Sequence, residues 1–260
     1  MDLELRDKVV LVTGGARGIG AAIVRALAAE GAVPVIVDRD ESATREIARE
    51  LTASGKRIET VLADLTDGAA CRAAVERAIG ASGRLDAVVN NAGVNDRVGL
   101  EDGSAEAFVD SLGRNLVHVY AVTHHALPAL KASRGAVVNI ASKVAMTGQG
   151  GTSGYAAAKG GILALTREWA VELLAAGVRV NAVVPAEVMT PLYEEWLSAF
   201  PDPKRALADI TARIPLGQRM TTADEIASAV VFLLSPRSAH TTGQHFVIDG
   251  GYVHLDRALR

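Results

Sequence analysis

Cysteine, aromatic residues and long apolar runs are scarce in this chain of 260 residues. Its single cysteine, Cys71, cannot form an internal disulfide, which favours a reducing compartment and predicts a cytoplasmic protein. The apolar runs have the length of strands, so no membrane span is expected, and the charged start MDLELRDK differs from a signal peptide. The net charge is only −3 and no long basic block is present, which argues against binding of nucleic acid.

Metal-ligating side chains are not clustered in the sequence either. His124 and His125 are adjacent, rather than at the spacing of four residues that lets two histidines on a helix share a metal. No metal site is therefore predicted, and Cys71 is expected to be a helix residue without chemistry.

Short apolar runs alternate with longer amphipathic stretches from one end of the chain to the other. Hydrophobic residues make up 49% of the chain, as suits a sheet that is covered on both faces. Helices between successive strands predict right-handed crossovers and a parallel sheet of about seven strands. The expected strands are Lys8–Thr13, Val33–Asp38, Ile58–Ala63, Ala87–Asn90, Ala136–Ile140, Arg179–Val184 and His245–Ile248. The expected helices are Gly18–Glu30, Glu41–Ala53, Gly68–Ala81, one or two within Ser104–Lys131, Ser153–Ala176 and Ala223–Leu234.

No linker rich in proline, glycine or serine divides the chain, so residues 1–260 are expected to form one domain. The conspicuous insertion is Pro191–Pro215, which carries Trp196 and Phe200 between the sixth strand and the last long helix. Open α/β sheets bind ligands at the carboxyl ends of their strands. The insertion at about 191–215 is therefore predicted to cover a substrate there.

A glycine-rich turn, Thr13–Gly20, follows the first expected strand and leads into a helix. Gly14, Gly18 and Gly20 would permit a tight turn, a close approach of the backbone to a pyrophosphate, and close packing of the helix on the sheet. The helix N-terminus would offer its N–H groups to the anion. The spacing is G-x-x-x-G-x-G, and a plain strand-to-helix turn is the alternative.

Acidic and amide side chains follow the next three strands, where they could contact a dinucleotide. Asp38 ends the second strand, and its carboxylate can accept both ribose hydroxyls of NAD and repel the 2′-phosphate of NADP. NAD is therefore predicted as the preferred cofactor; Arg17 and Arg39 flank the carboxylate and could soften the repulsion, so NADP is not excluded. Asp64 follows the third strand, placed either to touch an adenine ring or to cap a helix. Asn90–Gly93 ends the fourth strand, and its small residues either let a cofactor lie close or form an asparagine turn.

Four polar residues are the catalytic candidates. Tyr155 and Lys159 are four apart on an expected helix, so they face the same way. A nearby ammonium lowers the pKa of a phenol, which would let Tyr155 exchange a proton with an alcohol or carbonyl oxygen. Ser142 follows the fifth strand and could hydrogen-bond the oxygen that develops charge. Asn115 is a poor residue for a helix interior, so a kink or water contact is expected there, a solvent-facing side chain being the alternative.

Taken together, these segments resemble the short-chain dehydrogenase/reductase family over essentially the whole chain. The matching segments are Thr13–Gly20, Asp64, Asn90–Gly93, Asn115, Ser142, Tyr155–Lys159, Asn181, Pro185 and Thr190. The resemblance implies a three-layer Rossmann fold, with the doubly wound parallel sheet between helices on both faces and NAD(P) across the strand ends. It implies an oxidoreductase that moves a hydride between nicotinamide and a small alcohol or carbonyl.

The resemblance also implies a role for each site residue. Tyr155 would be the acid/base, Ser142 would position the substrate, Lys159 would hold the nicotinamide ribose and depress the tyrosine pKa, and Asn115 would anchor a water in a proton relay. The implied cofactor contacts are Gly14, Arg17, Gly18, Ile19, Gly20, Asp38, Asp64, Leu65, Asn91, Ala92, Gly93, Tyr155, Lys159, Pro185, Val188 and Thr190.

One departure from the family pattern is visible. The family usually has Pro-Gly where this chain has Pro185-Ala186. The extra methyl group borders the nicotinamide and the substrate, so it bears on substrate shape rather than on hydride transfer. Val188 and Thr190, which meet the carboxamide in the family, remain.

Substrate contacts are expected from Gln149, after Ser142, and from Glu187, after Pro185. Unpaired polar side chains in a pocket favour a substrate with many hydroxyl groups, because leaving them unpaired is costly. In the alternative, Gln149 and Glu187 face solvent or bond to the backbone.

A closer resemblance supports a sugar. Segments including Thr147–Gly150, Pro185–Tyr193 and Gly250–Asp256 are similar to bacterial L-fucose dehydrogenases of this family. The resemblance implies oxidation of the anomeric carbon of L-fucose or a related aldose to a lactone. The alternatives are a reductase of 3-oxoacyl thioesters, hydroxysteroids or other ketones and, more remotely, a regulator that binds NAD without catalysis.

Oligomeric state and the C-terminal tail are the last expectations. Members of the family are commonly tetramers, which implies a homotetramer here, and an apolar helix face with Ile162, Leu165, Trp169 and Leu173 is either core or subunit interface. His254 and the tail Leu255–Arg260 are expected either to close over a site or to fray.

Overall fold

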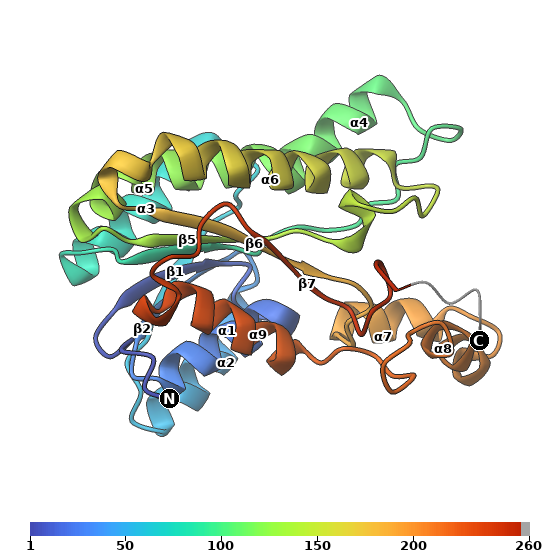
Figure 1. The fold of residues 1–260 in the computed structure, drawn as a ribbon, viewed down its shortest axis with the longest axis horizontal. Helices are drawn as coiled ribbons and strands as arrows, with labels where there is room; N and C mark the ends of the chain where they lie inside the picture. The colour runs from blue at the N-terminus through green and yellow to red at the C-terminus, as the bar shows by residue number, and fades with distance from the viewer. Residues whose placement is uncertain (256–260) are drawn as a thin grey trace.

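Residues 1–255 are described by the structure, a computed structural model, and they contain the predicted α/β fold. Seven parallel strands form one sheet in the order β3-β2-β1-β4-β5-β6-β7, which confirms the doubly wound parallel sheet (Figure 1). The strands are β1 (Val9–Thr13), β2 (Val33–Asp38), β3 (Glu59–Leu62), β4 (Ala87–Asn90), β5 (Ala136–Ile140), β6 (Arg179–Pro185) and β7 (His245–Ile248).

Helices cover both faces of this sheet. Figure 1 shows α3, α5 and α6 on one face and α1, α2 and α9 on the other, which completes the three-layer Rossmann architecture. The helices are α1 (Gly18–Ala29), α2 (Glu41–Ala53), α3 (Gly68–Ser82), α4 (Ala105–Leu112), α5 (His118–Ser133), α6 (Ser153–Glu172), α7 (Pro191–Ser198), α8 (Pro203–Thr211) and α9 (Ala223–Leu234). No helix within residues 1–255 is both long enough and apolar enough to cross a membrane.

Side chains of the central strands pack into one of two cores because successive residues of a strand point to opposite faces. In β1, Val10 and Val12 pack with α1 and α9, whereas Val9 and Leu11 pack with the helices of the other face. All four side chains are buried. Ile162 and Trp169 of α6, and Leu173 directly after it, are buried in this second core, which accounts for most of the apolar face seen in the sequence.

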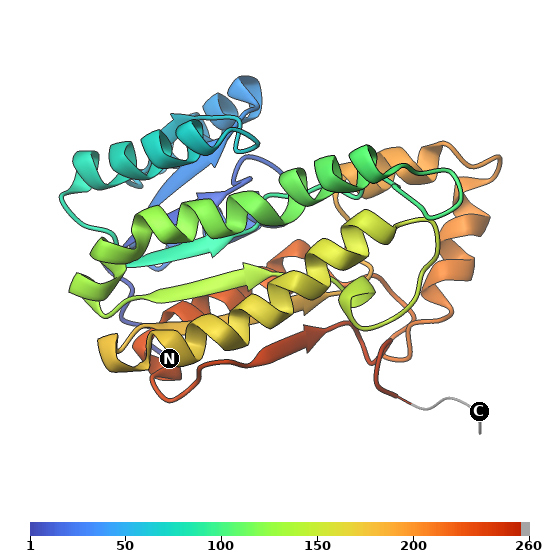
Figure 2. The ribbon, with the colours of Figure 1, turned by 90° about the horizontal axis from the view of Figure 1, so that it is seen from above.

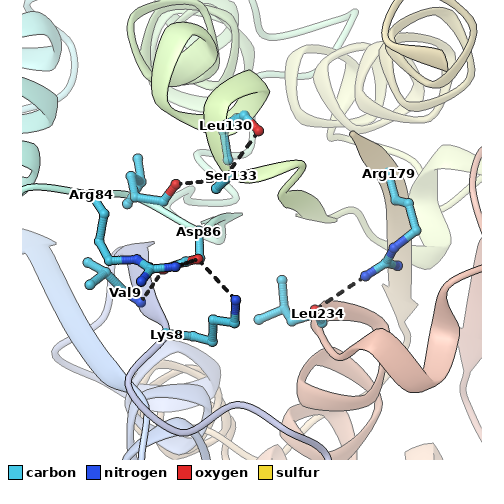
Figure 3. Close-up of polar contacts among 9 residues, drawn as sticks. Lys8, Val9, Arg84, Asp86, Leu130, Ser133, Arg179 and Leu234 are labelled. Carbon is cyan, nitrogen blue, oxygen red and sulfur yellow. Dashed lines mark hydrogen bonds and ion pairs between the residues drawn. The ribbon is translucent and has the colours of Figure 1, made fainter. Parts of the chain in front are cut away.

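The two ends of the strands differ in their surroundings. The predicted insertion forms α7 and α8, which lie beyond the carboxyl ends of the strands in the orange part of Figure 2. At the opposite, amino edge, Asp86 is buried directly before β4 (Figure 3). Its carboxylate accepts hydrogen bonds from the Val9 amide at 2.9 Å and from Arg84 at 2.6 and 2.8 Å, and it pairs with Lys8 at 3.3 Å. These contacts tie the starts of β1 and β4 together.

Arg179, the first residue of β6, makes the second polar cluster of the amino edge. Its guanidinium donates to the carbonyls of Leu233 at 2.7 Å, Leu234 at 3.2 Å and Ser235 at 3.1 Å; Figure 3 shows the contact with Leu234. The last carbonyls of a helix have no intrahelical partner, so a cation there stabilises the helix end. Arg179 therefore fixes the C-terminus of α9 to the sheet.

Candidate active site

A cleft of about 580 Å³ lies at the carboxyl edge of the sheet. This volume is within the range of small-molecule and cofactor sites. Most residues proposed from sequence line it: Gly14, Arg17, Gly18, Ile19, Asp38, Asp64, Leu65, Asn91, Ala92, Gly93, Ser142, Tyr155, Lys159, Pro185, Val188 and Thr190. Gly20, Asn115, Gln149 and Glu187 are not part of the lining.

The glycine-rich turn at one end of the cleft has the geometry that a phosphate loop needs. Gly14 has a φ of +62°, a conformation that favours glycine, and a Cβ atom on Gly20 would lie 2.0 Å from the Gly14 carbonyl oxygen. Asn91 holds this turn, since its Nδ2 donates to the carbonyls of Thr13 at 3.0 Å and Gly14 at 2.9 Å. The amides of Asn91 and Ala92 in turn donate to the Thr13 hydroxyl. The loop is thus bonded to the end of β4.

The N-terminus of α1 is suited to an anion. Helices α2, α3, α4 and α9 each begin after an Asp, Ser or Thr whose side chain caps the first turn. Helix α1 begins after Arg17, which makes no such bond, and its first turn holds no acidic residue. Because Gly18 and Ile19 line the cleft, the N–H groups of this turn are placed to bind a pyrophosphate. The residues present therefore fit a dinucleotide.

Asp38, the last residue of β2, lines the cleft beside the glycine-rich turn. Its two carboxylate oxygens accept hydrogen bonds from the amides of Ala16 and Asp40, both at 3.0 Å. Arg17 forms an ion pair with Asp40 at 2.8 Å, so the Asp40 carboxylate offsets its positive charge. Asp64 also lines the cleft while its Oδ1 accepts from the amide and hydroxyl of Thr66, so it caps a local turn as well.

The long helical segment predicted within 104–131 is interrupted at Asn115. The five residues Gly113–Val117 form a π-helical turn between α4 and α5, as the expected kink requires. The Asn115 side chain is fully buried: its Oδ1 accepts from the Val94 amide at 2.7 Å, and its Nδ2 donates to the Ser111 carbonyl at 3.0 Å. It is therefore not the solvent-facing residue of the alternative.

Asn115 and Lys159 meet around Gly93. A Cβ atom on Gly93 would lie 3.0 Å from Asn115 Oδ1 and 3.4 Å from Lys159 Nζ. The Lys159 ammonium also donates to the Ile140 carbonyl at 2.8 Å and lies 5.4 Å from the centre of the Tyr155 ring. Glycine at position 93 thus leaves room for the two polar side chains to approach each other.

Burial controls the acid–base properties of the Tyr155–Lys159 pair. Desolvation lowers the pKa of Lys159 to about 8, because a buried ammonium loses its hydration. Desolvation also raises the pKa of Tyr155 to about 12, and a hydrogen bond from Ser142 offsets only part of that rise. Burial therefore disfavours the phenolate in this structure, and the depression of the tyrosine pKa by Lys159 that the family resemblance implies stays a prediction.

The substrate residues expected from sequence are separated in the structure. Gln149 is exposed and lies outside the cleft lining, so its substrate contact stays a prediction. Glu187 is 12% exposed and forms an ion pair with Lys143, and its Oε2 accepts a hydrogen bond from the Tyr193 hydroxyl at 2.8 Å. Tyr193 itself lines the cleft. Neither alternative for Glu187, solvent or backbone, describes this arrangement.

Three polar residues of the cleft region were not identified from sequence. Lys143 directly follows Ser142, and Tyr193 lies in the first turn of α7, so position alone could have suggested both. His118 lies one turn after Asn115 and lines the cleft. Burial and the positive charge of Lys159 lower its pKa to about 4, so it is neutral near pH 7. In the sequence, only the closeness of His118 to Asn115 could have indicated that it lines the cleft.

The remaining expectations concern the tail and metals. His254 and Leu255 are exposed, and residues 256–260 of the predicted tail lie outside the described residues. In the part of the chain that the structure describes, no three His, Cys, Asp or Glu side chains are grouped to hold a metal. The Cys71 thiol is buried in α3, and burial raises its pKa to about 11.

The chain is similar to known proteins in sequence and in fold. A family profile described as Enoyl-(Acyl carrier protein) reductase matches residues 14–253. L-fucose dehydrogenase of Bos taurus is 42% identical over 252 residues, which are 96% of this chain and 91% of that protein. The 3-oxoacyl-[acyl-carrier-protein] reductase FabG of Thermotoga maritima is 34% identical over 96% of this chain and its own full length. The crystal structure of Cj0485 dehydrogenase has a TM-score of 0.94 and 46% identity, and the match covers 100% of this chain and 99% of that one. With this fold and these matches, the chain belongs to the short-chain dehydrogenase/reductase family of NAD(P)-binding oxidoreductases.

Proposed function

We propose that this protein is an NAD-dependent aldose 1-dehydrogenase, which oxidises the anomeric carbon of L-fucose or a related sugar to a lactone. The observation that carries the hydride-transfer chemistry is the cleft that joins the uncapped N-terminus of α1 to Ser142, Tyr155 and Lys159. The sugar is supported by the 42% identity to L-fucose dehydrogenase of Bos taurus across 96% of the chain.

Each catalytic residue has a defined role in this proposal. A nicotinamide bound in this cleft would supply the acceptor for the hydride that leaves C1 of the sugar. Ser142 hydrogen-bonds the anomeric oxygen, and Tyr155 takes its proton as the C1–O bond gains double-bond character. Lys159 would hold the nicotinamide ribose and would pass the proton away from Tyr155. Asn115, bonded through its side chain to Val94 and Ser111, holds the π-helical turn at which a relay water would be anchored.

Asp38 is the basis for proposing NAD over NADP. Its carboxylate lies at the cleft end beside the phosphate loop, where it would accept the adenosine ribose hydroxyls and repel a 2′-phosphate. Arg39 lines the same region and would weaken this preference without reversing it. A homotetramer in the cytoplasm completes the proposal, by analogy with the family.

Reduction of a 3-oxoacyl thioester is the second candidate. It is favoured by the 34% identity to FabG of Thermotoga maritima over nearly the whole of both chains. The same Ser142, Tyr155 and Lys159 would then act in the opposite direction, with Tyr155 donating a proton to the ketone oxygen.

A spectrophotometric screen at about 340 nm, the absorbance band of reduced nicotinamide, separates the candidates. L-fucose, D-arabinose, L-galactose, D-glucose and a simple secondary alcohol are each tested with NAD and NADP, and a 3-oxoacyl ester with NADH and NADPH. Fast reduction of NAD with L-fucose or its stereochemical relatives is expected. If no sugar reduces either cofactor and the oxoester oxidises NADPH, the protein is a 3-oxoacyl reductase and the proposal is wrong.

A further inference from the structure

A buried ion pair adjoins the catalytic serine. Lys143 follows Ser142 after β5, and Glu187 follows Pro185 and Ala186 after β6. Strands β5 and β6 are hydrogen-bonded neighbours, so the loops that follow them meet at the carboxyl edge. The Lys143 ammonium pairs with Glu187, and the two side chains are only 11% and 12% exposed.

Two tyrosines complete this cluster. The Tyr193 hydroxyl donates to Glu187 Oε2 at 2.8 Å, and burial raises the pKa of Tyr193 to about 12, so it stays a neutral donor. The Lys143 ammonium lies 4.5 Å from the centre of the Tyr252 ring, within the range of a cation–π contact. Four segments of the chain thus converge beside Ser142: the loops after β5, β6 and β7, and helix α7.

Stability is a weak reason for such a pair. The free-energy cost of desolvating a lysine and a glutamate is about as large as the gain from their attraction. Apolar residues of similar size often give a more stable fold. Burial lowers the pKa of Lys143, and the positive charge of Arg213 adds to this effect. The chain neighbours Ser142, Ala186 and Val188 line the cleft, as does Tyr193, so the pair lies directly behind its wall. Charged groups buried beside a cleft commonly serve a ligand.

We propose that Lys143, Glu187 and Tyr193 form the specificity-determining wall of the substrate pocket and bind neighbouring hydroxyl groups of an uncharged polyol. This inference rests on the proposed sugar oxidation and names the residues that select the sugar. An ammonium has three hydrogen-bond donors, and a carboxylate has about four acceptor positions. After the hydrogen bond between Lys143 and Glu187 is made, the pair can therefore still bind both hydroxyl groups of a diol.

The charge of the cluster explains the selectivity. Lys143 and Glu187 compensate each other, so a neutral sugar can replace water on both without leaving a net charge buried. A sugar acid would place its carboxylate against Glu187, and an acyl chain would leave both charges desolvated against methylene groups. Sites built to hydrogen-bond a hydroxyl group reject analogues without it strongly, by up to roughly 10⁴-fold.

Steady-state kinetics of four purified proteins tests the proposal: wild type, Lys143→Met, Glu187→Gln, and Lys204→Met as a control at an exposed lysine of α8. Each is assayed with NAD and either L-fucose or cyclohexanol, a secondary alcohol without further hydroxyl groups. Binding of NADH, followed by its fluorescence, and thermal melting report whether each variant keeps its fold and its cofactor site.

In Lys143→Met and Glu187→Gln, kcat/KM for L-fucose is expected to fall ~30-fold or more, chiefly through KM, as for loss of a hydrogen bond to a charged group. Their kcat/KM for cyclohexanol should not fall, because this alcohol has no second hydroxyl group to lose a hydrogen bond. Their affinity for NADH should stay within about twofold of wild type, as should every constant of Lys204→Met. Equal losses with both alcohols, or no loss with L-fucose, would overturn the inference while the proposed function stands. If the wild-type protein oxidises none of the aldoses, the proposed function is wrong, and this inference fails with it.

Discussion

The two edges of the sheet each hold a buried carboxylate among basic side chains, yet the two clusters differ in what they contact. At the amino edge, Asp86 is bonded to the Val9 amide, Arg84 and Lys8, all at the start of the strands (Figure 3). At the carboxyl edge, Glu187 is bonded to Lys143 and Tyr193, in segments that border a cleft of about 580 Å³.

The difference separates a structural cluster from a functional one. A cavity of about 270 Å³ also lies at the amino edge, lined by Lys8, Asp86 and Arg179. The contacts of these charges, however, are directed to one another, to a strand amide and to the carbonyl end of α9. The amino-edge charges hold the scaffold together, and the carboxyl-edge charges lie beside the cleft in which we propose that the substrate binds. Substitutions at the amino edge should therefore change stability, and substitutions at the carboxyl edge should change turnover.

The largest effect is expected for Tyr155→Phe, at the carboxyl edge. Losing the phenolic hydroxyl removes the group that takes the substrate proton, so kcat should fall ~10³-fold or more. Affinity for NADH and the melting temperature should stay near those of wild type, because the ring is retained. Stopped assays of lactone formation measure the loss, and activity within tenfold of wild type would remove Tyr155 from the mechanism. A protein that merely binds NAD would show no turnover to lose.

Asp86→Asn tests the amino edge and should act in the opposite way. Loss of a buried carboxylate with charged partners is expected to lower the free energy of unfolding by about 2 kcal/mol, with kcat/KM unchanged. Hydrogen bonds from Arg84 and Val9 and the charge of Lys8 outweigh burial and hold the pKa of Asp86 below its ordinary 3.8. A depressed folded-state pKa contributes stability above pH 3.8 that is lost as the pH falls through the folded value.

Urea unfolding at several pH values checks this prediction. The gap between wild type and Asp86→Asn should be widest at neutral pH and should narrow as the pH falls below 3.8. A variant that unfolds like wild type but loses turnover would erase the contrast between the two edges.

Asp38→Asn should change cofactor choice by about tenfold, equal to ~1.4 kcal/mol. The neutral amide no longer repels a 2′-phosphate, so the ratio of kcat/KM with NADP to that with NAD should rise. Kinetics with both cofactors at a fixed sugar concentration measure the ratio. Arg39→Ala is the paired variant and should lower the same ratio; an unchanged ratio in Asp38→Asn would show that the carboxylate does not select the cofactor.

The pH dependence of oxidation should be gradual, with a slope of at most tenfold per pH unit. Tyr155 and Lys159, with pKa values of about 12 and 8, are close enough to titrate as a pair, and oxidation needs the form that has lost one proton. The value of kcat/KM should therefore rise with pH and level off above about 8. In Lys159→Ala the rise should move toward the tyrosine value, and a flat wild-type profile from pH 6 to 10 would contradict this assignment.

Local sequence signals predicted much of this molecule. Gly14, Gly18 and Gly20 lie in one turn, and Tyr155 and Lys159 in one helical turn, so their geometry follows from a few residues of backbone. The kink expected from Asn115 is a π-helical turn for the same reason, because a buried asparagine amide competes with the helix for backbone partners.

The polar wall beside Ser142 could not be predicted in this way. Lys143 and Glu187 are 44 residues apart and meet only because β5 and β6 are neighbours in register. The pKa shifts of Tyr155 and Lys159 depend likewise on how much protein surrounds them, which spacing alone does not contain. Gln149 shows the opposite failure of sequence reasoning: it follows Ser142 in the loop that was expected to border the substrate, yet it lies outside the cleft lining.

Transfer of deuterium from L-fucose labelled at C1 tests the proposed chemistry most directly. Wild-type protein is incubated with NAD and the labelled sugar, and both products are analysed by mass spectrometry. The account predicts NADH that carries the deuterium, a lactone that has lost it, and no transfer by Tyr155→Phe. Reduced cofactor without deuterium, or no reaction with L-fucose or its relatives, would contradict it.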